Sequence, residues 1–176
     1  MRIYNLIFKT IFPFIFLRSV YKSLRFGENF SRFLEKLSFY KGEKSSKEII
    51  HIHAVSVGEV LASRKFTEEI QKRFPDHQLL ITCTTQTGSA IIKRLYGNSV
   101  FHQYMPFDLK VCLKRFLKIW KPEMTFILET EIWPNFINIL NEQNRKVFLV
   151  NGRMSEKSFK RYKPILPILD GVFSKL

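Results

Sequence analysis

Features that would identify several common protein classes are missing from this sequence. The two cysteines, Cys83 and Cys112, lie far apart and form no Cys-x-x-Cys pair, so neither a disulfide framework nor a zinc site is expected. The 176 residues include only 7 glycines. They form neither the Gly-x-Gly-x-x-Gly pattern of dinucleotide-binding proteins nor the phosphate-binding loop of nucleotide hydrolases. These absences argue against disulfide-rich, NAD-dependent and P-loop proteins.

Acidic residues are also scarce. The chain carries 29 Lys and Arg residues against 15 Asp and Glu residues, which gives a formal net charge of +14. Such a chain is expected to bind polyanions, meaning nucleic acid, anionic lipid or a phosphorylated substrate. The first 25 residues contain five of the positive charges and no acid. These charges lie beside an apolar, Phe-rich stretch and not in an aromatic-basic stripe, so we expect lipid and no nucleic acid.

The apolar stretch near the N-terminus is short for a membrane-spanning helix. Residues 3–17 are interrupted by Asn5, Lys9 and Pro13, whereas a spanning helix needs roughly 20 apolar residues. Arg2, Asn5 and Lys9 recur at helical spacing, which predicts an amphipathic helix on an anionic membrane surface. The flanking positive charges favour the cytoplasmic side. The alternatives are a core helix packed on the domain and a tilted single-pass anchor.

Strand and helix patterns alternate beyond a polar linker at residues 41–48. We therefore predict a membrane-associated helical segment at residues 1–40, the linker, and a Rossmann-like domain at residues 49–176. Strands are predicted near residues 49–54, 79–84, 100–104, 125–128 and 147–150, and helices near 60–74, 89–96, 109–120, 135–143 and 156–161. This alternation predicts an α/β fold, with a parallel sheet and helices on both faces.

In such a sheet, every segment that follows a strand faces the carboxyl edge, where ligands bind. Glu59 lies in the first of these segments, His53-Ala-Val-Ser-Val-Gly-Glu59, at the start of a predicted helix. The helix N-terminus offers free N–H groups and partial positive charge, which favour the ionised carboxylate that a general base requires. The alternative is that Glu59 only complements the helix dipole.

The later segments add hydroxyls, carboxylates and an arginine. Thr84-Thr-Gln-Thr-Gly-Ser89 could cradle a phosphate, or it could simply cap a helix. Glu129 and Glu131 alternate, so in an extended chain they point the same way, and one or both could cap the helix that begins near Pro134. Arg153 could clamp a phosphate or lie in solvent.

Three further residues are assigned structural roles. Asp108 is predicted to cap the helix at residues 109–120. His51 and His53 share one face of their strand, but no third ligand accompanies them, so a structural role is favoured over metal binding. We therefore predict no metal site.

The motifs, taken together and in order, resemble one protein family. They are Arg25-Phe-Gly-Glu28, His53-Ala-Val-Ser-Val-Gly-Glu59, Thr84-Thr-Gln-Thr-Gly-Ser89, Met105-Pro-Phe-Asp-Leu109, Leu128-Glu-Thr-Glu-Ile-Trp-Pro-Asn135 and Asn151-Gly-Arg-Met-Ser155. This order resembles the Kdo transferases, which add 3-deoxy-D-manno-octulosonic acid (Kdo) to the lipid A precursor of Gram-negative bacteria. The resemblance covers essentially the whole chain.

The resemblance implies the N-terminal half of a GT-B glycosyltransferase, in which two Rossmann-like domains enclose the active site. The N-terminal domain would bind the acceptor, the lipid A precursor lipid IVA, and the C-terminal domain would bind CMP-Kdo. Transfer would invert the anomeric centre without a metal or cofactor, during lipopolysaccharide biosynthesis at the cytoplasmic face of the inner membrane. The basic N-terminus would then meet phosphates of the lipid and of the anionic membrane.

The resemblance also implies roles for individual residues. Glu59 matches the family's catalytic base, which would deprotonate the 6′-hydroxyl of the acceptor's distal glucosamine. Glu129 matches a second essential acid that stabilises the transition state. The residues assigned to substrate binding are Ser56, Gly58, Thr85, Thr87, Gly88, Ser89, Glu131 and Arg153.

The chain departs from the family pattern at its end. It stops at Leu176, within what resembles the end of the first domain, and nothing in it matches the donor-binding residues. A fragment of a longer protein, a truncated gene product and half of a split enzyme would each explain this. We expect no Kdo transfer by the chain alone. The alternative function is a non-catalytic membrane-surface module that binds an anionic lipid.

Overall fold

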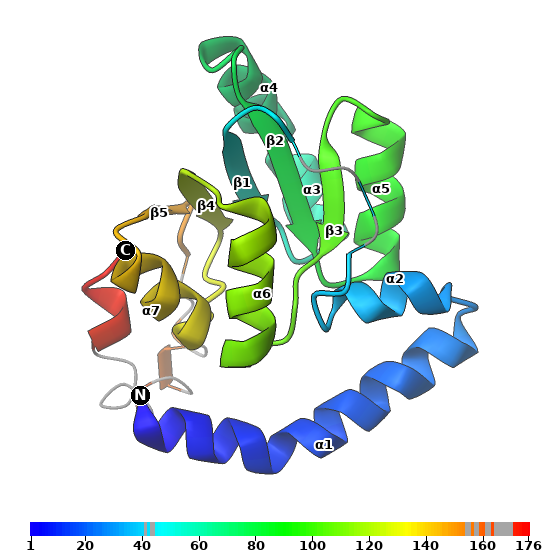
Figure 1. Ribbon diagram of the computed structural model, residues 1–176, viewed down its shortest axis with the longest axis vertical. Helices are drawn as coiled ribbons and strands as arrows, with labels where there is room; N and C mark the ends of the chain where they lie inside the picture. Colours follow the sequence, from blue (N-terminus) through cyan, green and yellow to red (C-terminus); the bar gives the residue numbers. More distant parts are fainter. Residues whose placement is uncertain (41, 43–44, 154–155, 157–158, 161–162, 164–170) are drawn as a thin grey trace.

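The computed structural model describes residues 1–176 except 41, 43–44, 154–155, 157–158, 161–162 and 164–170. Its centre is a five-stranded parallel sheet in the order β3-β2-β1-β4-β5 (Figure 1). The strands are β1 (Ile49–His53), β2 (Gln78–Cys83), β3 (Phe101–Tyr104), β4 (Met124–Leu128) and β5 (Lys146–Val150). The predicted α/β class is confirmed. The strand order reverses between β1 and β4, and in sheets of this kind the crevice at that point binds ligands.

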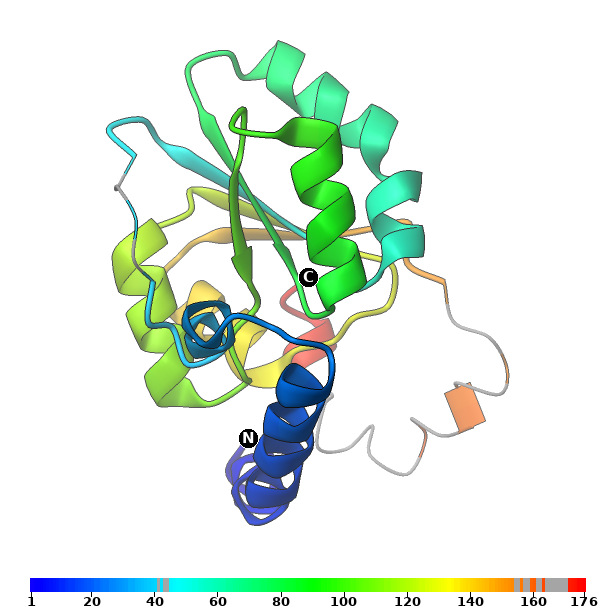
Figure 2. The same cartoon turned by 90° about the vertical axis from the view of Figure 1, so that its right-hand side faces the viewer.

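Helices cover both faces of the sheet (Figures 1 and 2). The helices α3 (Val57–Ala62), α4 (Arg64–Arg73) and α5 (Gln86–Tyr96) lie on one face, and α6 (Lys110–Trp120) and α7 (Pro134–Glu142) on the other. Successive side chains of a strand point to opposite faces. Ile50 and Ile52 therefore pack in the core beneath α4 and α5, whereas Ile49 belongs to the core beneath α6 and α7. Both Cys83 and Cys112 are buried.

One predicted helix is divided in the structure. The pattern at residues 60–74 corresponds to α3 and α4, which meet at Ser63. The buried Ser63 hydroxyl donates to the carbonyl of Val60 at 3.0 Å, and such local bonds from serine compete with continuation of a helix. The helix predicted at residues 156–161 and the linker predicted at residues 41–48 lie partly outside the described residues.

The helix α1 (Arg2–Arg25) runs along the carboxyl-edge side of the domain and bends in the region of Pro13, which lies inside it (Figure 1). It has 24 residues and is apolar enough to span a membrane by length and composition. Its apolar side chains point both ways, because Phe12 packs against Phe107 of the domain at 5.3 Å between ring centroids, while Phe14 is 74% exposed. The predicted amphipathic division is therefore wrong, and Asn5 of the supposed polar side bonds to the domain.

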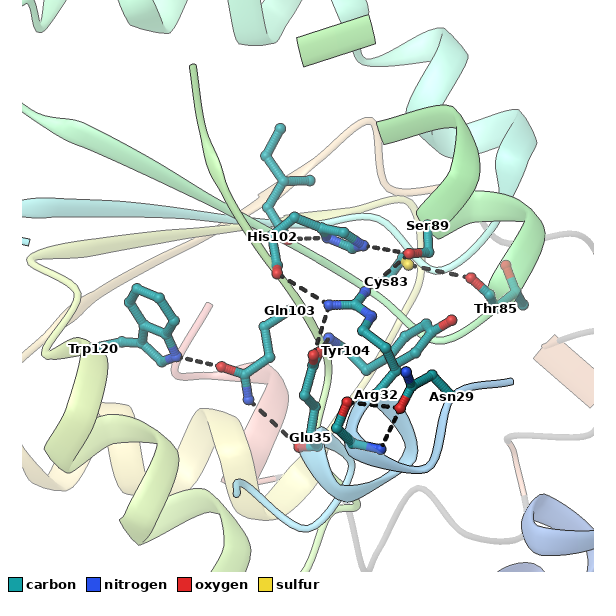
Figure 3. A network of polar contacts seen from close by, with 12 residues as sticks. Asn29, Arg32, Glu35, Cys83, Thr85, Ser89, His102, Gln103, Tyr104 and Trp120 are labelled. Atoms are coloured by element: carbon teal, nitrogen blue, oxygen red, sulfur yellow. Dashed lines mark hydrogen bonds and ion pairs between the residues drawn. The ribbon is translucent and has the colours of Figure 1, made fainter. Parts of the chain in front are cut away.

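The short helix α2 (Phe30–Glu35) is tied to β3 and α5 by a polar network (Figure 3). Arg32 donates to the Ser89 hydroxyl at 2.9 Å and to Glu35 at 2.6 Å. Glu35 in turn accepts from the main-chain N–H of Tyr104 at 2.9 Å. Arg32 also lies over the Tyr104 ring, 4.6 Å from its centroid. The domain boundary near residue 40 stays a prediction, but α2 is packed firmly on the sheet domain.

Candidate active site

A cavity of about 170 Å³ lies between the helices α3 and α4 and the carboxyl ends of β4 and β5. Its lining residues are Glu59, Ala62, Ser63, Phe66, Leu128, Glu129, Val150 and Asn151. Its strand residues come from β4, which lies next to the point of strand-order reversal, and from β5, while Glu59 lies in the helix that follows β1. The structure therefore brings Glu59 and Glu129 into one cavity.

Glu59 lies in the first turn of α3 and is only 7% exposed. One carboxylate oxygen accepts the main-chain N–H of Val55 at 2.7 Å, and the other accepts the hydroxyl of Ser56 at 2.9 Å. Ser56 is the N-cap residue and accepts from the N–H of Glu59. This reciprocal arrangement is a variant of the capping box, in which the carboxylate accepts the N–H of Val55 in place of that of the N-cap residue. Glu59 therefore lies in the first turn of α3, where an acid complements the helix dipole, and it also lines the cavity.

Glu129 has an unusual backbone conformation. Its φ angle is +57°, and Asn151 at the end of β5 has a φ angle of +55°. Asparagine adopts this left-handed region readily, whereas glutamate does so at a cost of roughly 1–2 kcal/mol. The N–H of Glu129 still pairs with the carbonyl of Val150 at 2.9 Å, so the chain turns directly after the sheet ladder ends. Strained backbone of this kind is concentrated at functional sites.

Glu131 interacts electrostatically with both other carboxylates. Its pKa is raised, first by burial and then by the charges of Glu59 and Glu129. The premise that Glu129 and Glu131 alternate along an extended chain is wrong, because residue 129 turns. Neither acid caps α7, whose N-cap residue is Trp133. Glu131 nevertheless lies close enough to Glu59 and Glu129 for their charges to raise its pKa.

The loop at residues 84–89 is a helix cap. Thr85 is the N-cap residue of α5, and its hydroxyl oxygen accepts the N–H of Gly88 at 3.1 Å. A Cβ atom at Gly88 would lie 2.9 Å from that oxygen, so the close approach requires glycine. Thr85 and Thr87 also line a second cavity of about 270 Å³, which includes Lys22 and Lys36. The phosphate-cradle interpretation stays a prediction for this cavity.

Ser89 lies in the network that holds α2 (Figure 3). Its hydroxyl accepts from Arg32, and it lies 2.7 Å from Nε2 of His102. Burial lowers the pKa of His102 to about 4. These contacts give the buried Ser89 a structural role on α5.

Gly58 and Arg153, the remaining predicted binding residues, are not among the lining residues of the cavity that Glu59 and Glu129 share. Gly58 is exposed, and a Cβ atom there would meet only the Ser56 hydroxyl oxygen at 3.9 Å. Arg153 is exposed; its N–H donates to Thr130 Oγ1 at 3.0 Å, and its side chain donates to Asn151 at 3.1 Å. It therefore lies beside the segment that carries Glu129 and Glu131. Met154 and Ser155 of the same motif lie outside the described residues.

His51 and His53 have the structural role that the sequence favoured. Each has a ring nitrogen 2.8 Å from Oγ1 of Thr82, and both are buried. A different group of possible metal ligands lies at the opposite, amino edge of the sheet. There Nε2 of His77 lies 2.9 Å from Glu123 and 3.5 Å from Glu48. This group is remote from the carboxylate cavity.

The sequence interpretation assigned Asp108 to the wrong helix. Asp108 does not cap α6; its carboxylate accepts the N–H groups of Asn135 and Phe136 in the first turn of α7, both at 3.0 Å. It also accepts the hydroxyl of Tyr4 at 2.7 Å. The only sign of this role in the sequence was that Asp108 is an acid in a segment that follows a strand.

Comparisons with known proteins decide the family. The family described as 3-deoxy-D-manno-octulosonic-acid transferase matches residues 31–176. The chain belongs to the Kdo transferase family. Its five-stranded parallel sheet with flanking helices is consistent with the N-terminal domain of the GT-B fold.

Curated relatives agree with this assignment. The Kdo transferase of Haemophilus influenzae is 36% identical over 167 residues, covering 94% of this chain and 38% of the relative. A probable mitochondrial Kdo transferase of Arabidopsis thaliana is 34% identical over 176 residues, covering 99% and 39%. The Kdo transferase of Rickettsia bellii is 33% identical over 163 residues, covering 93% and 39%. The chain thus spans about two-fifths of the length of these relatives.

Proposed function

We propose that this chain is the acceptor-binding half of an inverting Kdo transferase, which transfers Kdo from CMP-Kdo to lipid IVA. The supporting observation is that Glu59 and Glu129 line one cavity at the carboxyl edge of the sheet, in a chain of the Kdo transferase family. We assign acceptor binding to residues around that edge: Ser56, Gly58, Thr85, Thr87, Glu131 and Arg153. We assign no metal or cofactor.

Glu59 acts as the general base in this proposal. The bond from Val55 fixes one carboxylate oxygen, while the Ser56 hydroxyl on the other oxygen can rotate away and give its place to an acceptor hydroxyl. Glu59 takes the proton of the acceptor's 6′-hydroxyl while the oxygen of that hydroxyl bonds to the anomeric carbon of Kdo. The bond from that carbon to the phosphate oxygen breaks, and CMP leaves with the electron pair. Glu129 would stabilise positive charge that develops on the sugar.

α1 would hold the domain at the cytoplasmic face of the inner membrane. It carries five basic residues and exposes apolar side chains such as Leu6, Phe14 and Leu17. Its other side is fixed to the domain by Tyr4 and by the packing of Phe12 on Phe107. This attachment favours a helix that lies along an anionic membrane over one that spans it.

The test is Kdo transfer from CMP-Kdo to lipid IVA, with the chain alone and with the product of the adjoining reading frame. We expect transfer only in the mixture, and a loss of at least about 100-fold on Glu59→Gln. Glu69→Gln is the control, because Glu69 is exposed on α4 and pairs with Arg73. Full activity of the Glu59→Gln variant would contradict the assigned base. Lipid binding without turnover in either sample would favour the non-catalytic membrane-surface module.

A further inference from the structure

Asp108 joins two parts of the molecule that are distant in sequence. It is 2% exposed, and its two carboxylate oxygens accept three hydrogen bonds. Two come from the first turn of α7, from the N–H groups of Asn135 and Phe136 at 3.0 Å. The third comes from Tyr4 on α1, whose hydroxyl lies 2.7 Å away. One buried carboxylate therefore holds both the N-terminal helix and the start of α7.

The segment that carries Glu129 and Glu131 ends at this point. Its first residue is fixed to β5, because the N–H of Glu129 donates to the carbonyl of Val150 at 2.9 Å. Its other end passes into α7. The first N–H groups of that helix have no carbonyl partner within the helix and donate to the Asp108 carboxylate, whose negative charge also complements the helix dipole. The segment is thus a short bridge between two fixed points, and Asp108 is one of them.

α1 is joined to the same point by a second contact. Asn135 donates from its side-chain amide to Asn5 on α1 at 2.8 Å and to the main-chain carbonyl of Asp108 at 2.7 Å. Ile3 and Leu6, which neighbour Tyr4 and Asn5, are 60% and 70% exposed. The first two turns of α1 therefore present apolar side chains outward and bond to the start of α7 on their inner side.

We propose that Asp108 is a positioning residue that couples the placement of α1 to the placement of Glu129 and Glu131. The proposal rests on the proposed function, because the position of these carboxylates affects transfer only if they serve the reaction. Asp108 itself needs no contact with either substrate. It acts through Tyr4 on one side and through the first turn of α7 on the other.

The test compares Tyr4→Phe with Tyr21→Phe, two substitutions that each remove one hydroxyl from α1. Tyr21 is 60% exposed, so it provides the matched control. In Tyr4→Phe, Asp108 keeps its bonds to α7 but loses its bond to α1. We expect amide hydrogen exchange at residues 129–136 to become about 3- to 10-fold faster, the range expected when one hydrogen bond is lost. Exchange in β2 and in the Tyr21→Phe variant should stay as in the parent chain.

Kinetics supply a second readout that a purely structural role would not change in the same way. In the transfer assay, kcat of Tyr4→Phe should fall about 3- to 10-fold, while KM for CMP-Kdo stays unchanged. Asp108→Asn should accelerate exchange at residues 129–136 further; if it does not fold, Tyr4→Phe decides alone. Equal exchange and equal kcat in the Tyr4→Phe and Tyr21→Phe variants would overturn the coupling. Absence of transfer by the parent chain in the mixture with the product of the adjoining reading frame would instead count against the proposed function, and the exchange comparison would still decide the coupling.

Discussion

At the start of α3, the Ser56 hydroxyl donates to Oε1 of Glu59 at 2.9 Å and accepts the main-chain N–H of Glu59. Glu59 also lines the cavity that it shares with Glu129. Glu59 therefore has two possible roles, closing the end of α3 and removing a proton from a substrate. Substitution of its partner Ser56 separates them.

Replacing Ser56 with alanine should lower the free energy of unfolding by about 0.5–2 kcal/mol, because α3 loses its N-cap. At saturating acceptor, transfer should survive within about tenfold, since Glu59 keeps its bond from Val55 and weaker acceptor binding would change KM instead. Glu59→Gln should lose at least about 100-fold in rate. Urea unfolding and transfer rates measure the two effects. Equal loss of rate in both variants would mean that the cap, and not a base, accounts for the need for Glu59.

Glu131 can report on the cavity directly. Its pKa is raised by burial and then by the charge of Glu59. Glu59→Gln removes that charge, so the pKa of Glu131 should fall toward its ordinary value. Carbon-13 NMR titration of the side-chain carboxyl measures this, with Glu69→Gln as the remote control. A Glu131 titration that does not respond to Glu59→Gln would show that the carboxylates are not close in solution.

Buried histidines should make the protein sensitive to acid. Burial lowers the pKa of His53 and of His102 from 6.5 to about 4. The unfolded chain therefore binds these protons more readily, and stability is complete above pH 6.5 and lost as the pH falls toward 4. For each histidine, the difference between 6.5 and about 4 corresponds to about 3 kcal/mol at full protonation.

The measurement is urea unfolding between pH 7 and pH 4, for the parent chain and for His102→Asn. The variant should lose less stability on acidification, because one of the neutral histidines is gone. Burial raises the pKa of Asp108 to about 6, so its protonation stabilises the folded state as the pH falls, opposite to the effect of the histidines. Both proteins contain Asp108, so this contribution does not affect the comparison. Parallel pH curves for the two proteins would contradict the prediction.

Two glycines at helix starts should respond differently to alanine. At Gly88 the new Cβ would lie 2.9 Å from Thr85 Oγ1 and disturb the cap of α5, so stability should fall by about 0.5–2 kcal/mol. At Gly58 the nearest atom would be 3.9 Å away, so stability should hold or rise slightly. Thermal unfolding of both variants checks this. A loss of acceptor binding in stable Gly58→Ala would indicate close approach of the lipid, whereas a destabilised Gly58→Ala would contradict the geometry.

The sheet and the meeting of Glu59 with Glu129 could be predicted from the sequence, for one physical reason. Parallel strands joined by helices bring every post-strand segment to the same edge, so the order of short apolar runs determines which residues meet. The left-handed conformation of Glu129 could not be predicted in this way, because a tertiary constraint imposes it on a residue that does not prefer it.

The partners of Asp108 and Ser89 were also beyond the local sequence. Asp108 was assigned to the helix that follows it directly, but it caps a helix 27 residues further on. Ser89 looked like part of a ligand loop, but it contacts Arg32, 57 residues away. Local spacing identifies polar residues near an edge; the packing of distant elements decides which of them face a cavity.

The burial of both cysteines has a practical consequence for experiments on α1. Burial raises the pKa of the Cys83 thiol to about 12 and also raises that of Cys112, so neither thiol reacts readily at neutral pH. A cysteine introduced at Phe14 or Leu17, on the exposed side of α1, would be the reactive thiol of the chain. A fluorophore or spin label attached there would report the depth and tilt of α1 in a lipid bilayer, with no need to remove the native cysteines.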